Sequence, residues 1–433
     1  MPRCTATVTT RSHARPMRWM RKMIMPKVTV LDVRLYGEPV ATLTNLQDGR
    51  TIFAFNDAYI EDEKRPTLSL SLKDPFGALI TKFRPYNTVV PPFFSNLLPE
   101  GPLRKYLADR AGVKPSREFF LLWMLGRDLP GAVTVHPSKG DDAPPDDEQA
   151  IVEARPNALR FSLAGVQLKF SAFKNDKKGG GLTIPAEGTG GSWIVKLPSQ
   201  QYSGVPENEF AMMTIARMMG MDVPELQLVD LDAVSGLPQG VGELHGQALA
   251  IKRFDRTPEG AVHIEDFAQV FGVFPDHKYD RGNYRMIGRV LGIETSTADV
   301  AEFIRRLVFS TLIGNGDLHL KNCSLIYPDR RTPALSPAYD LLSTIPYIEG
   351  EDTAALNFSR TKKMAALSKD ELTHLAAKAE LSEKLVIDTA RETVERFRTV
   401  WEAEKKNLPM AAKVTDTIDT HAPKVELYRE FAK

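Results

Sequence analysis

The chain is organised around IGNGDLHLKN, residues 313 to 322, whose last six residues bring together a carboxylate, an imidazole, an ammonium and a carboxamide. Before it, apolar residues between 300 and 312 recur at the spacing that buries one stripe of an amphipathic helix. Gly314 and Asn315 are residues that commonly end helices, and 323–327 is a short apolar run closed by a proline. We therefore predict that the polar residues lie on a rigid connection between a buried helix and a buried strand, where catalytic groups can be held in place.

The polar residues of this stretch have the spacing of a phosphoryl-transfer site. Asp317 precedes Asn322 by five residues, as the base precedes the metal-binding amide in the catalytic loop of kinases. In that loop the carboxylate accepts the proton of the attacking hydroxyl, and the amide binds magnesium. Asp340 follows and would supply a hard anionic oxygen to a metal-bound triphosphate. A merely solvated polar loop is the alternative, and the flanking apolar elements argue against it.

Several segments, in the same order along the chain, resemble the HipA-type serine/threonine kinases, which are toxins of bacterial type II toxin–antitoxin systems. The matching segments are 93–101 (FFSNLLPEG), 161–169 (FSLAGVQLK), 194–198 (IVKLP), 207–209 (ENE), 252–256 (KRFDR), 265–269 (EDFAQ) and the stretches around residues 317 and 340. The resemblance implies an α+β, two-lobed protein-kinase-like fold. Its N-terminal lobe would be β-rich with an extra N-terminal subdomain, and its C-terminal lobe all-helical.

The resemblance also implies a role for individual residues, with ATP and Mg2+ as cofactors. Asp317 would be the catalytic base, Asn322 and Asp340 the metal ligands, and Ser162 an autophosphorylation site. The residues implied to bind ATP are Ala164, Gly165, Val166, Gln167, Leu168, Lys169, Lys196, Lys252, Arg253, Phe254, His319 and Tyr339. With a single glycine, the loop 164–169 matches neither Walker A nor GxGxxG, so the residues alone would predict an ordinary hairpin there.

Lys196 ends a short predicted strand and could hold the α and β phosphates. Glu207 and Glu209 follow two residues apart on a predicted helix, so at most one of them can pair with Lys196. We predict Glu209 as this partner, with an exposed capping role as the alternative. The connection 252–254 would bond the adenine edge through its backbone. Lys252 stands where the family often has an acid, which leaves this backbone role intact and argues against a side-chain role.

Other catalytic or metal-binding patterns are absent or weak. The sequence has no GxSxG, HExxH or P-loop lysine motif. His263, Glu265 and Asp266 have a spacing that fits no standard metal site, and capping of the next helix is predicted instead.

The composition is that of an ordinary globular protein. The 433 residues are 42% hydrophobic and 26% charged, enough for a sizeable core in two or three domains. A net charge of +1 argues against a globally basic nucleic-acid binder. The two cysteines, Cys4 and Cys323, cannot form a disulfide framework, so a reducing cytoplasm is expected. No apolar run approaches the ~20 residues of a membrane helix.

We predict five segments. Residues 1–27 are a basic extension. We predict that translation starts at Met25 and that the start site is assigned too early, with a functional basic tail or a transit peptide as alternatives. Residues 28–136 would be the N-terminal subdomain, with strands at 29–33 and 67–72. The remaining segments are an acidic, proline-rich linker at 137–150, the kinase N-lobe at 151–255 and the C-lobe at 256–427.

The resemblance implies a toxin kinase that moves the γ-phosphate of ATP to a host protein such as an aminoacyl-tRNA synthetase, inhibiting growth and favouring persistence. A HipB-like helix-turn-helix antitoxin would neutralise it and join it to operator DNA. Two alternatives are a catalytically silent module that holds the antitoxin on DNA, and a metal-dependent hydrolase using Asp317, His319 and Asp340. The complete set of Asp317, Asn322 and Asp340 argues against the silent module.

Overall fold

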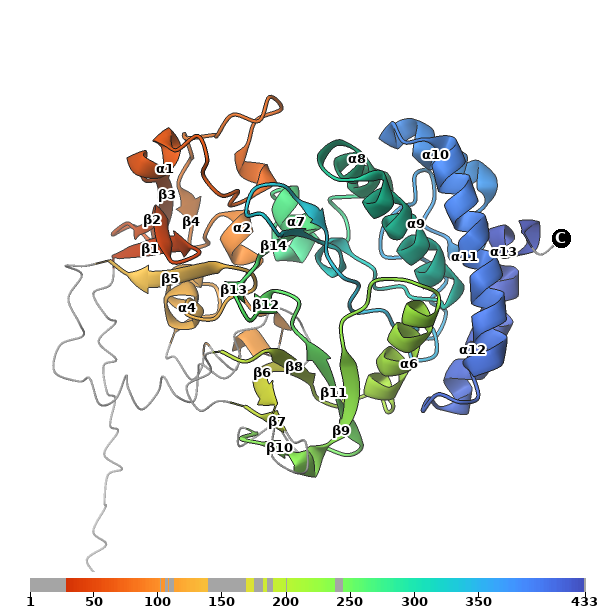
Figure 1. The fold of residues 1–433 in the computed structure, drawn as a ribbon. Coiled ribbons are helices and arrows are strands. Elements are labelled where there is room, and N and C mark those ends of the chain that lie inside the picture. The colour runs from red at the N-terminus through yellow and green to blue at the C-terminus, as the bar shows by residue number, and fades with distance from the viewer. Residues whose placement is uncertain are drawn as a thin grey trace, which may run out of the picture.

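The structure is a computed structural model that describes residues 29–101, 103–105, 108, 113–138, 169–174, 182–184, 190–199, 201–237 and 244–431 (Figure 1). Several sequence predictions fall outside these residues: the basic extension 1–27, nearly all of the linker 137–150, Ser162, and the loop residues Ala164, Gly165, Val166, Gln167 and Leu168. Among the described residues, no helix combines the length and the apolar character needed to cross a membrane.

The N-terminal subdomain is built on an antiparallel sheet in the order β4-β3-β2-β1-β5. Its strands are β1 Val30–Leu35, β2 Glu38–Asn45, β3 Arg50–Phe55, β4 Tyr86–Asn87 and β5 Val133–Pro137. Helices with described bounds that accompany it are α1 Asp57–Glu61, α2 Pro92–Ser95 and α4 Glu118–Leu125. Alternate residues of β1 are buried, which is the period-2 pattern expected of a strand with one buried face. The strand predicted at 29–33 is therefore confirmed.

The strand predicted at 67–72 is wrong, because this segment ends in a 3-10 turn, Leu70–Leu72. The Ser69 hydroxyl accepts a hydrogen bond from the Ser71 N–H, which starts the turn. Glu265, distant in sequence, accepts hydrogen bonds from the Ser69 hydroxyl at 2.6 Å and the Leu70 N–H at 3.0 Å. Local capping and this tertiary partner satisfy the backbone without a neighbouring strand.

The second sheet has the order β10-β7-β6-β8-β11-β9. Its strands are β6 Lys169–Lys174, β7 Leu182–Thr183, β8 Trp193–Lys196, β9 Leu226–Asp230, β10 Val234–Ser235 and β11 Gln247–Lys252. Helix α6, Val205–Met218, packs on β9 and β11 and on the other side contacts α11, Glu383–Glu404 (Figure 1). One buried hydrophobic cluster joins this sheet to that of the N-terminal subdomain.

Helices dominate the C-terminal part, which Figure 1 shows in teal and blue. Besides α11, they are α8 Tyr284–Glu294, α9 Thr297–Leu312, α10 Lys369–Ala379, α12 Ala412–His421 and α13 Glu426–Glu430. Short 3-10 turns in this part lie at Pro275–His277, Leu320–Asn322, Met364–Ala366 and Ala422–Lys424. Another 3-10 turn, Leu231–Ala233, lies between β9 and β10 of the second sheet. Helix α9 packs on α11 and α8 on α10, so the apolar stripe predicted between 300 and 312 faces the core.

The prediction that this lobe is all-helical needs a correction. A sheet runs through it in the order β14-β15-β16, formed by His263–Asp266, Ser324–Tyr327 and Ala334–Leu335. A hairpin of β12 Arg256–Thr257 and β13 Gly260–Ala261 precedes it, and α7 Phe267–Val270 follows β14. The run 323–327 is too short for a helix and is buried, so its backbone groups pair with β14 and β16.

The end of α9 sets the path of the chain into the polar stretch. Gly314 has φ +67°, its N–H donates to the Thr311 carbonyl at 3.2 Å, and the Asn315 N–H donates to the Ser310 carbonyl at 2.8 Å. These two bonds are the Schellman ending, which favours glycine because of its positive φ. A Cβ on Gly314 would also collide with the Ile345 side chain. The predicted helix stop is confirmed.

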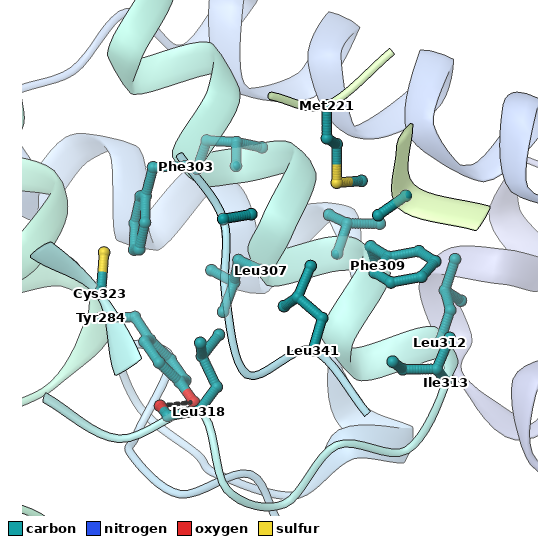
Figure 2. Close-up of a cluster of buried hydrophobic side chains, with 14 of the residues drawn as sticks. Met221, Tyr284, Phe303, Leu307, Phe309, Leu312, Ile313, Leu318, Cys323 and Leu341 are labelled. Atoms are coloured by element: carbon teal, nitrogen blue, oxygen red, sulfur yellow. Dashed lines mark hydrogen bonds between the residues drawn. The ribbon is translucent and has the colours of Figure 1, made fainter. Parts of the chain in front are cut away.

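Apolar residues within and after the polar stretch anchor it to the core. Figure 2 shows Leu318 and Leu341 in the same cluster as Leu307 and Phe303 of α9. The Tyr284 hydroxyl donates a hydrogen bond to the Leu318 carbonyl at 2.9 Å. The segments that carry the polar residues are therefore fixed on both sides by buried packing.

Candidate active site

A cleft of about 740 Å³ brings together every predicted site residue that lies in the described part of the chain. The second sheet contributes Lys169, Lys196 and Lys252, and α6 contributes Glu209. Arg253 and Phe254 directly follow β11. The C-terminal lobe contributes Asp317, His319, Asn322, Tyr339 and Asp340. Asn96 and Glu100 of the N-terminal subdomain also line it. Segments more than 200 residues apart thus meet around one cavity of the size of small-molecule sites.

The loop that carries Asp317 is held by its own hydrogen bonds. The Asp317 N–H donates to Asn315 Oδ1 at 2.9 Å, and the Asp317 carbonyl accepts from Asn322 Nδ2 at 2.8 Å and from the His319 N–H at 2.7 Å. The bond from Asn322 Nδ2 leaves its amide oxygen as the atom that could ligate a metal. The Asp317 carboxylate points into the cleft, with 45% of its side chain exposed.

Among the described residues, one side chain donates a hydrogen bond to the Asp317 carboxylate. The Tyr279 hydroxyl donates to Asp317 Oδ1 at 2.6 Å, and His319 Nε2 lies 4.0 Å from the same oxygen. Loss of water in the cleft raises the pKa of Asp317 to about 6, a rise that the Tyr279 hydrogen bond opposes and the Asp340 charge increases. A carboxyl with this pKa is ionised at neutral pH and basic enough to accept a proton.

Lys196 on β8 joins two carboxylates from different parts of the fold. Its Nζ lies 2.6 Å from Glu209 Oε1 on α6 and also bonds Asp340 Oδ1. Burial would lower the pKa of Lys196, but the charges of Asp340 and Glu209 outweigh burial and raise it. The Glu207 carboxylate forms no ion pair with Lys196 in the described structure, so Glu209 is the glutamate of this ion pair.

Asp340 is held in an unusual backbone conformation. Its φ is +54°, in the left-handed region that a non-glycine residue rarely adopts and that is often found at functional sites. Burial would raise the pKa of Asp340, but Lys196 and Lys169 hold it well below the ordinary value. Its carboxylate therefore stays ionised, as a metal ligand must.

Lys169 lies directly across from Lys196 in the pairing of β6 with β8. Burial and the Lys196 charge lower the pKa of Lys169 to about 8. The Asp340 charge raises this pKa and offsets only part of the lowering. Two ammonium groups therefore line the cleft side by side, an arrangement suited to a polyanion such as a triphosphate.

The structure narrows the prediction for 252–254. The Lys252 and Arg253 N–H groups donate to the carbonyls of Glu225 and Ser192, each at 2.8 Å, so they cannot also bond an adenine edge. The Arg253 side chain is buried and paired with Asp255 at 2.9 Å. Among the described residues, the carbonyls of this connection and the Phe254 N–H are the backbone groups that remain for adenine. The N–H groups of Lys252 and Arg253 are used because the hydrogen-bonded pairing of β11 continues to the end of the strand.

Two aromatic residues complete this side of the cleft. The rings of Phe254 and Tyr339 are 5.9 Å apart and tilted by 32°. The Tyr339 hydroxyl donates to the Lys321 carbonyl at 2.9 Å, which fixes its ring. His319 lies deeper, and burial together with the Lys278 charge lowers its pKa to about 3. His319 is therefore a neutral imidazole at neutral pH and a poor partner for phosphate charge.

The residues present fit a magnesium ion held mainly by substrate phosphates. Magnesium prefers hard oxygen ligands and commonly binds through one or two protein groups plus phosphates. The Asn322 amide oxygen and the Asp340 carboxylate supply two such groups in one cleft. Across the described ranges, no group of three or more His, Cys, Asp or Glu side chains could hold a metal alone.

A charged cluster in the cleft, not predicted from the sequence, comes partly from the N-terminal subdomain. Glu100 lies 2.7 Å from both Lys278 Nζ and Lys321 Nζ, and Lys321 Nζ also donates to the Asn96 carbonyl at 2.9 Å. The Tyr279 ring lies against Lys278, with 5.4 Å between Nζ and the ring centroid. Glu100 belongs to the matching segment 93–101, so a signal existed, but nothing in the sequence connects it to residues 178 or more positions away.

Within the cluster at 263–266, only Asp266 has the helix-capping role that the sequence predicted. Asp266 caps α7, accepting from the Gln269 N–H at 2.8 Å in a capping box. Glu265 binds the segment around Ser69, and His263 Nε2 bonds the Leu68 carbonyl at 2.8 Å. These residues fasten the N-terminal subdomain to the C-terminal lobe.

Comparisons with known proteins agree with this architecture. The model of the HipA N-terminal domain matches residues 31–136, and that of the HipA-like C-terminal domain matches 161–401. A protein of Sinorhizobium fredii named "Putative kinase Y4dM" is 97% identical over 409 residues, 94% of this chain and 100% of that protein.

Two further similarities come from Shewanella oneidensis. Its "Serine/threonine-protein kinase toxin HipA" is 29% identical over 304 residues, 61% of this chain and 65% of that protein. A solved complex of HipA, HipB and operator DNA from this organism contains a chain with a TM-score of 0.67 and 21% identity, covering 93% of this chain and 96% of that one. The family models span most of the chain. The fold is two-lobed and kinase-like. The chain therefore belongs to the HipA family of kinases and is related to the serine/threonine kinase toxin HipA.

Proposed function

We propose that the protein is an ATP- and magnesium-dependent serine/threonine protein kinase. The observation that carries this proposal is the cleft in which a half-exposed Asp317 faces the ion-paired Lys196 and Asp340. A kinase needs a base open to the acceptor and fixed charges for the phosphates, and it needs both in one cavity. A metal-dependent hydrolase using Asp317, His319 and Asp340 is less well supported, because in the described part of the chain no three His, Cys, Asp or Glu side chains are grouped so that they could hold a metal ion.

The proposed roles follow from the contacts. Asp317 accepts the proton of the acceptor hydroxyl, and its loop hydrogen bonds keep its carboxylate aimed into the cleft. Lys196 and Lys169 bind the phosphates, and Glu209 fixes Lys196 in place. Magnesium, bound by Asn322 and Asp340, would neutralise charge on the β and γ phosphates.

Further parts of the proposal concern partners and biology. The family membership supports a toxin that inhibits growth and favours persistence by phosphorylating a host protein, for which an aminoacyl-tRNA synthetase is our candidate. The Shewanella complex supports a HipB-like antitoxin and operator DNA reached through it. We also propose that Ser162 is autophosphorylated. Its phosphate, with a charge of about −1.5 to −2, would be expelled from apolar neighbours and from ATP phosphates, taking the loop 164–169 with it.

The test compares the wild type with Asp317→Asn and with Asp232→Asn, a control at an exposed acid on the far end of the second sheet. We expect Asp317→Asn to lose phosphate transfer from radiolabelled ATP to a generic protein acceptor by about 10² or more, with ATP affinity within a few fold. Asp232→Asn should match the wild type in both assays. Retention of more than about a tenth of the rate by Asp317→Asn would show that Asp317 is not the base.

Growth of a bacterial host provides a second readout. Overproduction of the wild type should stop growth, and overproduction of Asp317→Asn at the same level should not. Equal toxicity of the two chains would favour the catalytically silent, antitoxin-binding module instead.

A further inference from the structure

Tyr279 holds the place at the catalytic base that an acceptor hydroxyl needs. During transfer the acceptor must donate a hydrogen bond to the base, with about 2.6–3.2 Å between the heavy atoms. The Tyr279 hydroxyl donates such a bond to Asp317 Oδ1 at 2.6 Å. In the described part of the chain, no serine or threonine hydroxyl bonds the Asp317 carboxylate. The phenol is thus the hydroxyl that the structure itself presents to the base.

The surroundings of Tyr279 are those of a reactive rather than a buried structural tyrosine. Its side chain is 48% exposed, and it lines the same cleft as Lys196, Asn322 and Asp340. It lies on the short connection between the turn Pro275–His277 and helix α8, outside any regular element. The Tyr279 hydroxyl therefore lies at the base, in the cleft, on a segment that is not held by a helix or strand.

The position of Tyr279 also suits the product of a transfer. The Lys278 ammonium lies 5.4 Å from the centre of the Tyr279 ring and is kept there by Glu100 at 2.7 Å. The His319 ring packs edge-on against the phenol, with 4.9 Å between centroids. A phosphate on the Tyr279 oxygen would carry about −1.5 to −2 charges and would have the Lys278 cation close by.

We propose that Tyr279 is an intramolecular phosphate acceptor, a modification that rests on the proposed kinase function. With magnesium ATP in the cleft, Tyr279 Oη forms a bond to the γ-phosphorus, and the bond from that phosphorus to the β–γ bridging oxygen breaks. ADP leaves with the electron pair of the broken bond. The phenolic proton passes to Asp317 and from there to solvent, so the products are phosphotyrosine, ADP and a proton.

The modification would limit further transfer. A dianionic phosphate on Tyr279 would stand beside the Asp317 carboxylate and repel it. It would also fill the space that a protein acceptor must enter. Phosphorylation of Tyr279 would therefore slow the kinase from the acceptor side of the cleft, independently of the proposed phosphorylation of Ser162.

The test is mass spectrometry of the full chain after incubation with magnesium ATP. Trypsin would cut after Lys278 and Arg281 and reduce the site to a tripeptide, so a protease that spares Arg281, such as one specific for lysine, is required. We expect phosphate on Tyr279 in the wild type and none at this position in Tyr279→Phe. Tyr428→Phe, which alters a part-buried tyrosine on α13, is the matched control and should keep the phosphate on Tyr279.

Two further arms separate the possible failures. Because the reaction is intramolecular, the fraction of chains modified at a fixed time should not change with protein concentration. For the same reason, an isotope-labelled Asp317→Asn chain mixed with unlabelled wild type should stay unmodified at Tyr279. Phosphate on a generic protein acceptor or on Ser162, with none on Tyr279, would overturn this inference and leave the kinase intact. Absence of transfer to any acceptor, with ATP bound, would instead refute the proposed function.

Discussion

Replacement of Glu100 by Gln tests whether the N-terminal subdomain holds the active site together. The carboxylate is the shared partner of Lys278 and Lys321, whose side chains are only 10% and 7% exposed. Glutamine keeps the size of the side chain but removes its charge. Two ammonium groups would then remain buried without a counter-charge, which is the costly way to break a buried ion pair.

Two independent routes give the magnitude. Burial would raise the pKa of Glu100, but the Lys321 and Lys278 charges outweigh it and lower the pKa from 4.5 to about 2. At ~1.4 kcal/mol for each pKa unit, that difference corresponds to about 3 kcal/mol at neutral pH. Removing one partner of a buried pair typically costs about 3–5 kcal/mol. We therefore expect Glu100→Gln to lose about 3 kcal/mol of unfolding free energy at pH 7.

The pH dependence has a definite sign. A carboxyl whose folded-state pKa is depressed stabilises the protein fully above its unfolded pKa, here 4.5, and loses that contribution as the pH falls through about 2. Glutamine does not titrate. The stability difference between wild type and Glu100→Gln should thus shrink from about 3 kcal/mol at pH 7 to about 1 kcal/mol at pH 3.

The assay is urea unfolding followed by tryptophan fluorescence at both pH values, with Glu63→Gln as the control. Glu63 is an exposed acid of the same subdomain, and its replacement should change stability by less than about 0.5 kcal/mol. A Glu100→Gln protein as stable as Glu63→Gln at pH 7 would refute the reasoning. So would a difference that stays constant between pH 7 and pH 3.

Three other predictions concern the cleft. Asp340→Ala should weaken binding of magnesium ATP by about tenfold or more, measured by calorimetry with and without magnesium; an unchanged affinity would remove Asp340 from the metal site. Gly314→Ala should lower the unfolding free energy by about 2–5 kcal/mol, from left-handed strain and the collision with Ile345, and a melting temperature equal to that of the wild type would contradict this. Transfer should fall as the pH drops below about 6, where Asp317 becomes protonated, and a rate unaffected between pH 7 and pH 5 would contradict its role as base.

The order of elements around the active site could be predicted because it depends on local pattern. The apolar stripe of α9, its glycine ending and the short strand after Asn322 each follow from residues within one or two turns of one another. The same holds for Lys196 at the end of β8. Asp266 was predicted as a helix cap from its neighbours alone, and the capping box confirms it.

Errors arose where a local pattern met a distant partner. The alternating run at 67–72 reads as a strand, yet Glu265 from the C-terminal lobe binds its backbone and the segment turns instead. At 252–254 the sequence could not show that the β11 ladder uses the N–H groups that adenine would need. Hydrogen-bond partners chosen across the fold override what neighbouring residues favour.

The sequence by itself determined the helix, loop and strand that carry Asp317 and Asn322, and the likeness of their spacing to that of kinases, because periodicity and chain-local chemistry act over a few residues. Only the tertiary structure decided that Glu100 binds Lys278 and Lys321, and that Tyr279 bonds the base. These contacts join segments whose separation along the chain carries no information about their distance in space. They form because burying the shared core brings the sheets and helices together, and the buried charges then have to find partners.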